Sequence, residues 1–197
     1  MKPDKTTIEI YNSKIEEYLQ MVKSELELEI EANFAKSLPR GGTVLDYGCG
    51  PGHSAKYFAD QGLISHAFDA STEMVRVASK NPNVKVWQST FHKFTSTNTY
   101  NGIWASFSLL HAPRSDMQFL LEKIHSALKS DGKFYIAIKL GNGELRDTLG
   151  RIYTYYQEEE LRQVLKNAGF IWQSHHVGRS TGLDGKTAQW IAVLAHV

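Results

Sequence analysis

The amino-acid sequence predicts an α/β fold: a doubly wound sheet of seven strands, mostly parallel with an antiparallel C-terminal strand, and helices on both faces. Three observations predict this class. From residue 43 onward, short apolar runs typical of strands alternate with amphipathic helical segments. A glycine-rich turn joins the first strand to the helix that follows it. The last two strands follow each other without a helix, which is typical of an antiparallel hairpin at the end of a parallel sheet.

The first forty residues predict helix in two pieces. One face of the first piece carries apolar or aromatic residues at three- and four-residue spacing: Tyr11, Ile15, Tyr18 and Val22. Ser24 followed by Glu27 forms a capping-box pattern that begins the second helix, and Pro39 ends it. We expect residues 1–40 to form a helical lid or cap, and residues 41–197 to form the main domain of one folding unit.

The remaining elements follow in alternation. The expected strands are 43–46, 65–68, 84–87, 102–107, 134–138, 170–177 and 188–196. Four helices are expected. The first is 53–60, and the second begins after the N-cap Ser71 and stops at Asn81-Pro82. The third carries the apolar stripe of Phe119, Leu120, Ile124, Ala127 and Leu128, and the fourth is 158–168. Asn101-Gly102 is interpreted as a turn that leads into the fourth strand, and Asp131-Gly132 as the end of the third of these helices.

Composition narrows the function classes. The chain has 197 residues, with 22 Lys and Arg against 21 Asp and Glu, and this near-zero net charge weighs against a nucleic-acid partner. No apolar run approaches the roughly 20 residues that cross a bilayer, so no membrane partner is expected. The single cysteine, Cys49, forms no intramolecular disulfide and fits a reducing cytoplasm. We expect a cytoplasmic protein, as a monomer or homodimer, that acts on a small molecule.

The segment from Val44 to Gly52 is the most informative one. Its glycines permit positive φ and let a ligand approach the backbone where a helix N-terminus offers free N–H groups. A dinucleotide-binding pattern requires its third glycine at position 53, which His53 occupies. Asp46, ahead of the glycines, is not part of that pattern, and its carboxylate can meet the amino group of a methionine-like ligand. A tight strand–helix turn without a ligand is the alternative.

This segment resembles the first motif of class I S-adenosylmethionine-dependent methyltransferases of the small-molecule type. The resemblance extends from about Thr43 to the C-terminus and includes 101–106, 109–111, 128–134, 157–161 and 168–170. It implies a Rossmann-like sheet, S-adenosyl-L-methionine as cofactor and S-adenosyl-L-homocysteine as its product. Tyr11 and Tyr18 resemble the lid helix that often precedes such a domain, with ordinary core packing as the alternative.

The resemblance also implies a cofactor site at the strand ends. Asp69 ends the second strand, where a carboxylate accepts hydrogen bonds from both ribose hydroxyls; a place in the N-cap region of the next helix is the alternative. Family members often carry an acid after the third strand, but residues 87–92 contain none, so Thr90 is expected to serve the adenine. The expected cofactor-binding residues are Tyr11, Tyr18, Asp46, Gly48, Gly50, Asp69, Ala70, Met74, Thr90, Phe91 and Ser106.

His111, just past the fourth strand, is the candidate catalytic base for an alcohol or amine acceptor; a helix-entry position before Pro113 is the alternative. The segment after the fifth strand combines glycines with cations and tyrosines, which predicts a mobile loop. Within it Lys139, Arg151 and Tyr153 are expected to bind an acceptor that bears a carboxylate or an aromatic ring. A solvated loop followed by core tyrosines is the alternative.

The sequence therefore predicts methyl transfer to an oxygen, sulfur or nitrogen atom of a small molecule, by in-line substitution that depends mainly on proximity and orientation. No catalytic metal is expected, because His175 and His176 are adjacent on a strand and point to opposite faces. Two alternatives stay open. One is a catalytically silent protein that binds S-adenosylmethionine, and the other is an NAD(P)-dependent oxidoreductase.

Overall fold

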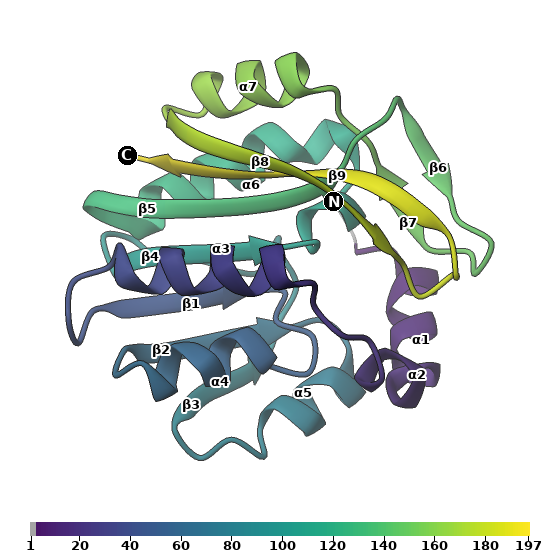
Figure 1. Cartoon of the computed structure of the whole chain (residues 1–197), viewed down its shortest axis with the longest axis horizontal. Helices are drawn as coiled ribbons and strands as arrows, with labels where there is room; N and C mark the ends of the chain where they lie inside the picture. Colours follow the sequence, from purple (N-terminus) through teal and green to yellow (C-terminus); the bar gives the residue numbers. More distant parts are fainter. Residues whose placement is uncertain (1–2) are drawn as a thin grey trace.

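A central sheet of seven strands has the order β3-β2-β1-β4-β5-β9-β8 (Figure 1). The structure is a computed structural model that describes residues 3–197. The strands of this sheet are β1 (Thr43–Tyr47), β2 (Ile64–Asp69), β3 (Val84–Gln88), β4 (Tyr100–Ser106), β5 (Leu128–Lys139), β8 (Ile171–Thr181) and β9 (Thr187–His196). β1 to β5 pair in parallel, and β9 pairs antiparallel with both β5 and β8. The predicted class, strand number and antiparallel C-terminal end are confirmed.

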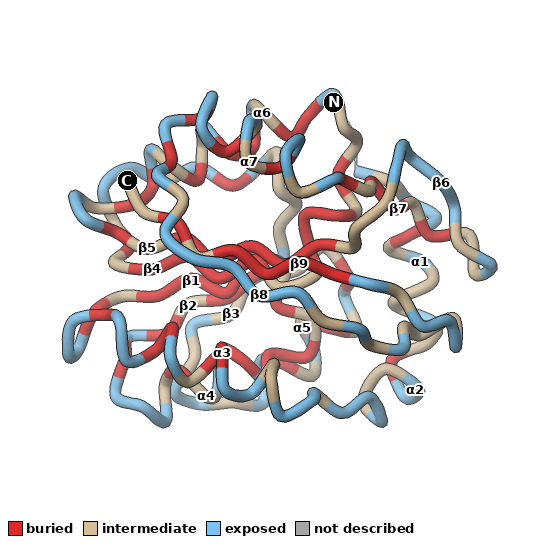
Figure 2. The backbone as a smooth tube through the Cα atoms, turned by 45° about the horizontal axis from the view of Figure 1, so that its top comes forward, coloured by how far each residue is buried: buried red, intermediate tan, exposed pale blue. Residues whose placement is uncertain are grey.

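Helices cover both faces of this sheet (Figure 1). They are α1 (Lys5–Ser13), α2 (Ile15–Leu19), α3 (Glu25–Lys36), α4 (His53–Asp60), α5 (Thr72–Ala78), α6 (Arg114–Ala127) and α7 (Glu158–Asn167), with a single 3-10 turn, η1 (Leu109–His111). On one face, Phe34 of α3 and Phe58 of α4 pack against Trp104 of β4. On the other, Leu120 of α6 and Leu161 of α7 belong to the largest buried cluster. Figure 2 shows the buried sheet between these two layers.

The order of the strands reverses between β1 and β4. The chain runs from β1 outward to β2 and β3 and then returns to β4 on the other side of β1. In open parallel sheets this reversal leaves a crevice at the carboxyl ends of the two strands, where ligands bind. α1 and α2 lie at this edge (Figure 1), so the first helices of the chain cover the crevice.

The N-terminal prediction is right in its second piece and wrong in its first. α3 begins at the predicted capping box, in which Ser24 and Glu27 bond reciprocally. The predicted helix face from Tyr11 to Val22 is broken, because helix α1 ends at Ser13 and α2 ends at Leu19. Val22 is 92% exposed and lies outside any helix. The apolar spacing alone therefore overstated the length of this helix.

Three smaller predictions also need correction. Asn101-Gly102 forms no turn but lies inside β4, where the Asn101 side chain accepts hydrogen bonds from Thr43 N–H and from Lys129. α6 ends at Ala127 rather than near Asp131-Gly132, because Leu128 already pairs with Tyr100 as the first residue of β5. Phe119 is 42% exposed and does not belong to the buried stripe of α6.

The segment after β5 is not the loop that its glycines predicted. It forms a second, two-stranded sheet of β6 (Glu144–Arg146) and β7 (Ile152–Thr154), paired antiparallel. β6 is exposed along its length, whereas Tyr153 and Thr154 of β7 are buried (Figure 2). We refer to residues 144–154 as the β6–β7 hairpin. None of the helices in residues 3–197 is long and apolar enough to cross a membrane.

Candidate functional site

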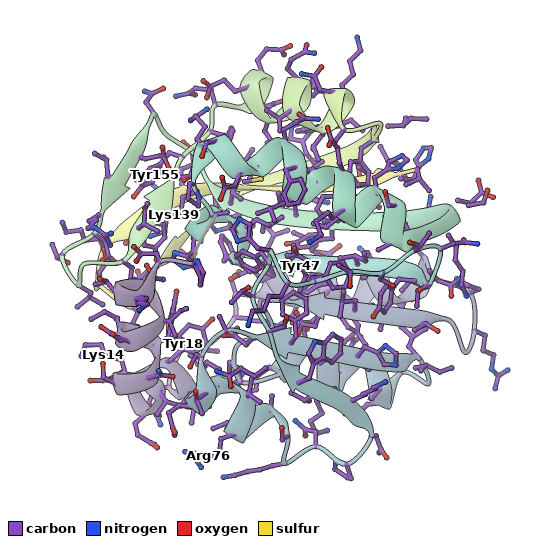
Figure 3. The ribbon with its side chains drawn as sticks, turned by 180° about the vertical axis from the view of Figure 1, so that it is seen from behind. Lys14, Tyr18, Tyr47, Arg76, Lys139 and Tyr155 are labelled. Carbon is purple, nitrogen blue, oxygen red and sulfur yellow. The ribbon has the colours of Figure 1, made fainter. Side chains whose placement is uncertain are left out.

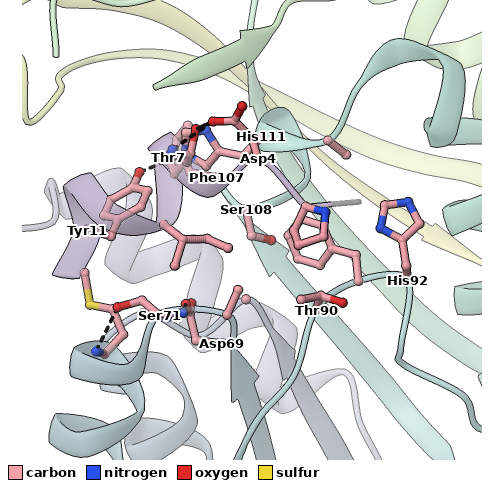
Figure 4. A pocket seen from close by; sticks show the side chains of 18 of the residues that line it. Asp4, Thr7, Tyr11, Asp69, Ser71, Thr90, His92, Phe107, Ser108 and His111 are labelled. Atoms are coloured by element: carbon pink, nitrogen blue, oxygen red, sulfur yellow. Dashed lines mark hydrogen bonds between the residues drawn. The ribbon is translucent and has the colours of Figure 1, made fainter. Parts of the chain in front are cut away.

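A cavity of about 100 Å³ opens at the carboxyl ends of β1, β2, β3 and β4, beneath α1 (Figure 4). We call it the first cavity. The sequence-predicted residues that line it are Tyr11, Tyr18, Gly48, Gly50, Asp69, Ala70, Met74, Thr90, Phe91, Ser106 and His111. They come from five separate segments of the chain, and the reversal of strand order brings them together.

A second cavity of about 170 Å³ lies beside the first. The two share Tyr11, Tyr18, Gly48, Ser106 and Phe107 as a common boundary. The remaining sequence-predicted residues line this second cavity: Asp46, Lys139, Arg151 and Tyr153. The end of the β8–β9 hairpin, residues 180–183, closes it on another side. The arrangement therefore gives two adjoining chambers at one edge of the sheet.

The glycine turn that separates β1 from α4 requires its glycines. Gly48, Gly50 and Gly52 have φ values of +78°, +53° and +81°, in the left-handed region that side chains disfavour. A Cβ atom on Gly48 would lie 2.5 Å from the Cβ of Ser108. The N–H groups of Gly48 and Cys49 both donate to the carbonyl of Phe68, so the turn is fastened to β2. At Gly48 and Gly50 no side chain separates the backbone from the first cavity.

Asp69 stands at the centre of the first cavity wall. Its two carboxylate oxygens accept hydrogen bonds from the N–H groups of Gly50 (2.9 Å) and Ser71 (2.8 Å), and burial raises its pKa. The N-cap of α5 is Ser71, whose side chain accepts from Met74 N–H. Asp69 is therefore not a helix cap. Each oxygen keeps acceptor capacity for a ligand in the cavity.

Asp46 is buried next to the second cavity. It accepts one hydrogen bond, from Ala55 N–H at 3.1 Å, and burial raises its pKa to about 7. Lys23 forms an ion pair with Glu31, which is 3% exposed, and donates to the Ser54 hydroxyl at 2.9 Å. Lys23 and Glu31 were not predicted as site residues, and no local sequence pattern marks them.

A chain of hydrogen bonds connects His111 to α1. The His111 Nδ1 faces the carbonyl of Ile152 at 2.6 Å, and because a carbonyl only accepts, Nδ1 carries the proton. Nε2 therefore accepts from the Tyr11 hydroxyl at 2.8 Å, and that hydroxyl accepts from Arg151 Nη1 at 2.9 Å. Burial lowers the pKa of His111 to about 4, so the ring is neutral near pH 7. Its proton-accepting nitrogen is occupied by Tyr11 (Figure 4).

Arg151 is only 1% exposed, whereas a mobile loop would have left it in contact with solvent. Its guanidinium bonds to the Asp147 carboxylate at 2.9 Å through Nε and at 2.6 Å through Nη2. The charge of Arg151 is thus already paired, and an N–H group on Nη1 holds Tyr11. A role in positioning α1 fits these contacts better than direct pairing with an acceptor carboxylate.

α1 is fastened on both sides of the first cavity. Toward the β6–β7 hairpin, Asp4 pairs with Arg146 at 2.7 Å, and the Thr7 hydroxyl accepts from Ile152 N–H at 3.0 Å. Toward α5, the side-chain oxygen of Asn12 accepts from the Ser71 hydroxyl at 2.7 Å. The helix therefore bridges the two halves of the crevice as a lid would.

Other cavity residues were not anticipated. Phe107 follows β4 with a φ of +52° and lies at the boundary of both cavities. Its position directly after a central strand was the available signal. His92 lines the first cavity and bonds to the buried Asp116 at 2.8 Å. Within residues 3–197, no group of three or more His, Cys, Asp or Glu side chains has the geometry to hold a metal ion.

A family model described as a methyltransferase domain matches residues 16–174. The chain belongs to this methyltransferase family. The match covers β1 to β5, most of the residues that line the two cavities, and the first residues of β8. No curated protein matches the chain significantly.

Solved structures of methyltransferases share the fold of this one. A Burkholderia thailandensis 1,6-didemethyltoxoflavin-N1-methyltransferase, with that compound and S-adenosylhomocysteine bound, has a TM-score of 0.79 at 21% identity and matches 97% of this chain and 87% of its own. A Methanosarcina mazei S-adenosylmethionine-dependent methyltransferase has a TM-score of 0.74 at 16% identity, with 85% and 96% matched. A Haemonchus contortus phosphoethanolamine N-methyltransferase has a TM-score of 0.67 at 21% identity, with 85% and 52% matched. At these identities the likeness establishes the fold.

Tyr11→Phe tests whether the hydroxyl fastens α1. The substitution removes one donor and one acceptor, and leaves Arg151 Nη1 and His111 Nε2 without their partner. We expect amide hydrogen exchange in residues 5–19 to accelerate about tenfold, as the loss of one to two buried hydrogen bonds predicts.

Tyr18→Phe is the matched control, because the Tyr18 hydroxyl has no hydrogen-bond partner within residues 3–197 although its ring packs edge-on against Tyr11. It is expected to leave exchange in α1 near the wild-type rate. Equal acceleration in both variants would show that ring packing, rather than the hydrogen bonds, holds the helix.

Proposed function

We propose that this methyltransferase moves the methyl group of S-adenosyl-L-methionine to an oxygen, sulfur or nitrogen atom of a small molecule. The observation that carries the proposal is the pair of chambers that meet at Gly48 and Phe107, one beside Asp69 and the other beside Lys139. Two chambers with a narrow common boundary suit a donor and an acceptor aligned for in-line substitution. When bound, S-adenosylmethionine supplies a methyl group activated by the positive charge on its sulfur.

The residues of the first cavity fit the nucleoside part of this cofactor. Asp69 has free acceptor capacity for two ribose hydroxyls, because its present donors are backbone N–H groups. Met74 and Phe91 offer apolar surface for a flat base, beside Ala70 and Thr90. Gly48 and Gly50 allow the ligand to approach the backbone, and Tyr11, Tyr18 and Ser106 enclose its other side.

The charges around Asp46 fit the amino-acid part. Asp46 and Glu31 contribute two carboxylates, while Lys23 contributes one ammonium group. When both carboxylates are ionised, this cluster carries one surplus negative charge in a buried place. The α-ammonium of a methionine moiety would neutralise it, which explains why an acid precedes the glycine turn.

The part of the second cavity around Lys139, Arg151 and Tyr153 is proposed for the acceptor, because the amino-acid part of the donor takes the part around Asp46. Solved neighbours named for small-molecule acceptors, the N1-methyltransferase of B. thailandensis and the phosphoethanolamine N-methyltransferase of H. contortus, support a small acceptor. For an acceptor that carries a proton, the Tyr11 hydroxyl and His111 behind it form the route to a base. Arg151 and Tyr153 shape the wall of this chamber.

The proposal assigns a covering role to part of the N-terminal segment. Within residues 1–40, α1 and α2 act as the lid, whereas α3 packs on the sheet, and residues 41–197 form the catalytic domain. We further propose a cytoplasmic monomer or homodimer that works without a catalytic metal, nucleic acid or membrane. The buried free thiol of Cys49 suits such a compartment.

Asp69→Ala tests the donor site by isothermal titration with S-adenosyl-L-homocysteine. The wild-type protein is expected to bind this thioether and neither NAD nor NADP. The variant loses two hydrogen bonds to a charged acceptor, so its affinity is expected to fall roughly 100-fold.

Asp60→Ala is the control, because that carboxylate is exposed at the end of α4 and pairs with Lys56 away from both cavities. Preferential binding of a dinucleotide, or full affinity for the thioether in Asp69→Ala, would refute the assignment.

The raised pKa of Asp46 predicts a pH dependence. In the free protein this carboxyl binds a proton below about pH 7, whereas a bound ammonium group favours its ionised form. Below pH 7, binding of S-adenosylhomocysteine should therefore release a proton, and the affinity should fall by up to tenfold for each unit that the pH decreases. Above pH 7 the affinity should level off. Titration in buffers of different ionisation enthalpy measures the proton.

Asp46→Asn should flatten this profile near pH 7. Residual weakening of binding at lower pH is expected from Asp69, because burial also raises its pKa. His53 is the other titratable group here: it lies near Lys23, and burial lowers its pKa. An unchanged profile in the variant would assign the dependence to one of those groups instead.

A further inference from the structure

The side chain of Lys139, the last residue of β5, lies at the second cavity beside the β6–β7 hairpin (Figure 3). Its ammonium group stands 4.2 Å from the ring centroid of Tyr153. Across residues 3–197 the structure records no carboxylate within 4.0 Å of it and no hydrogen bond from it. Burial lowers the pKa of this lysine, and the more distant carboxylates of Asp184 and Asp147 oppose the shift only in part.

The charged groups around Lys139 do not neutralise it. Asp147 is committed to Arg151, with which it forms an ion pair at 2.6 Å. Asp184, in the turn between β8 and β9, acts on Lys139 only at longer range. The chain at Gly182 closes over the ammonium group, since a Cβ atom there would lie 3.3 Å from Lys139 Nζ. The cavity therefore holds one partly buried positive charge that forms no ion pair with a carboxylate of residues 3–197, although Asp184 and Asp147 act on it at longer range.

The other cations at this chamber are already paired, and burial lowers the pKa of His53, which favours its neutral form. Arg151 is paired with Asp147, and Lys23 is paired with Glu31. His111 is neutral, and its free nitrogen accepts from Tyr11. Lys139 is thus the cation that remains available to a ligand among the described cavity residues. A partly buried ammonium group without an ion-pair partner favours an anionic ligand, because part of its desolvation has already taken place.

The walls around Lys139 are flat and apolar. Tyr153 lies under its ammonium group, and Phe107 stands at the entrance from the first cavity, edge-on to Trp190 at 5.9 Å. Tyr18 and Leu110 complete this side of the chamber. Aromatic walls of this kind favour a planar ligand, with faces or edges against the rings.

We propose that the methyl acceptor is a small planar anion whose negatively charged group pairs with the Lys139 ammonium. This inference rests on the proposed function and names the chemical class of its acceptor. Lys139 holds the anion against the Tyr153 ring, and the charge pair selects it over a neutral molecule of the same shape. An uncharged acceptor would leave the buried ammonium group without a counterion.

The test compares anionic ligands with neutral ones of matched shape on the protein saturated with S-adenosylhomocysteine. The probes are benzoate against benzamide and ionised 4-nitrophenol against 4-nitroanisole, with binding followed by titration calorimetry. In the wild type each anion is expected to bind at least about tenfold more tightly than its neutral partner. The visible absorbance of bound 4-nitrophenol is expected to titrate at lower pH than that of the free compound.

Lys139→Met should abolish this preference, and Lys139→Arg should retain it. Lys133→Met is the matched control on the same strand, because Lys133 is an exposed lysine that contacts Gln173 away from the cavity. The affinity of every variant for S-adenosylhomocysteine reports whether the donor site is intact.

Three results would overturn the proposal: neutral probes that bind as tightly as the anions in the wild type, an anion preference that survives in Lys139→Met, or no anion binding at millimolar concentration. If S-adenosylhomocysteine itself does not bind the wild type, the proposed function fails as well. If it binds and the preference is absent, only the acceptor class is wrong.

Discussion

The turn from Gly48 to Gly52 is the constraint on which the rest of the site depends. Its glycines take up left-handed backbone angles where β1 meets the reversal of strand order, and the turn is hydrogen-bonded to the end of β2. Because no side chain projects from Gly48, Ser108 packs directly on the backbone. The same geometry places Gly50 N–H on the Asp69 carboxylate. The conformation of this turn thus fixes the floor of the first cavity, the position of Asp69 and the boundary between the two chambers at Gly48.

The charges of the two chambers are complementary to the proposed ligands. At the donor end, Asp46 adds a carboxylate to a cluster whose single ammonium group already pairs with Glu31. At the acceptor end, Lys139 supplies an ammonium group that forms no ion pair with a carboxylate among residues 3–197. Burial makes both arrangements costly in the free protein. A cationic amino-acid group on one side and an anionic acceptor on the other would relieve both costs together.

Local patterns in the sequence predicted the residues that we propose for the cofactor. Contacts between distant parts of the chain determine the remainder of the site. Asp46, Gly48 and Asp69 were predictable because strand ends and glycine spacing fix their positions along the chain. The pairing of His111 with Tyr11 joins residues 100 positions apart, which no periodicity reveals. The glycines after β5 indicated a mobile loop, but strand pairing in the β6–β7 hairpin and the buried pair of Arg151 with Asp147 order it. Propensity is a weak guide where such contacts decide.

The central claim is that the donor binds in the first cavity and at the Asp46 end of the second, and that the acceptor binds at the Lys139 end of the second. A crystal structure of the protein with S-adenosyl-L-homocysteine tests it most directly. The account predicts ribose hydroxyls on the Asp69 carboxylate, the amino group at Asp46 and the sulfur atom facing the boundary at Phe107. A ribose bound away from Asp69, or a ligand that occupies the space beside Lys139, would contradict it.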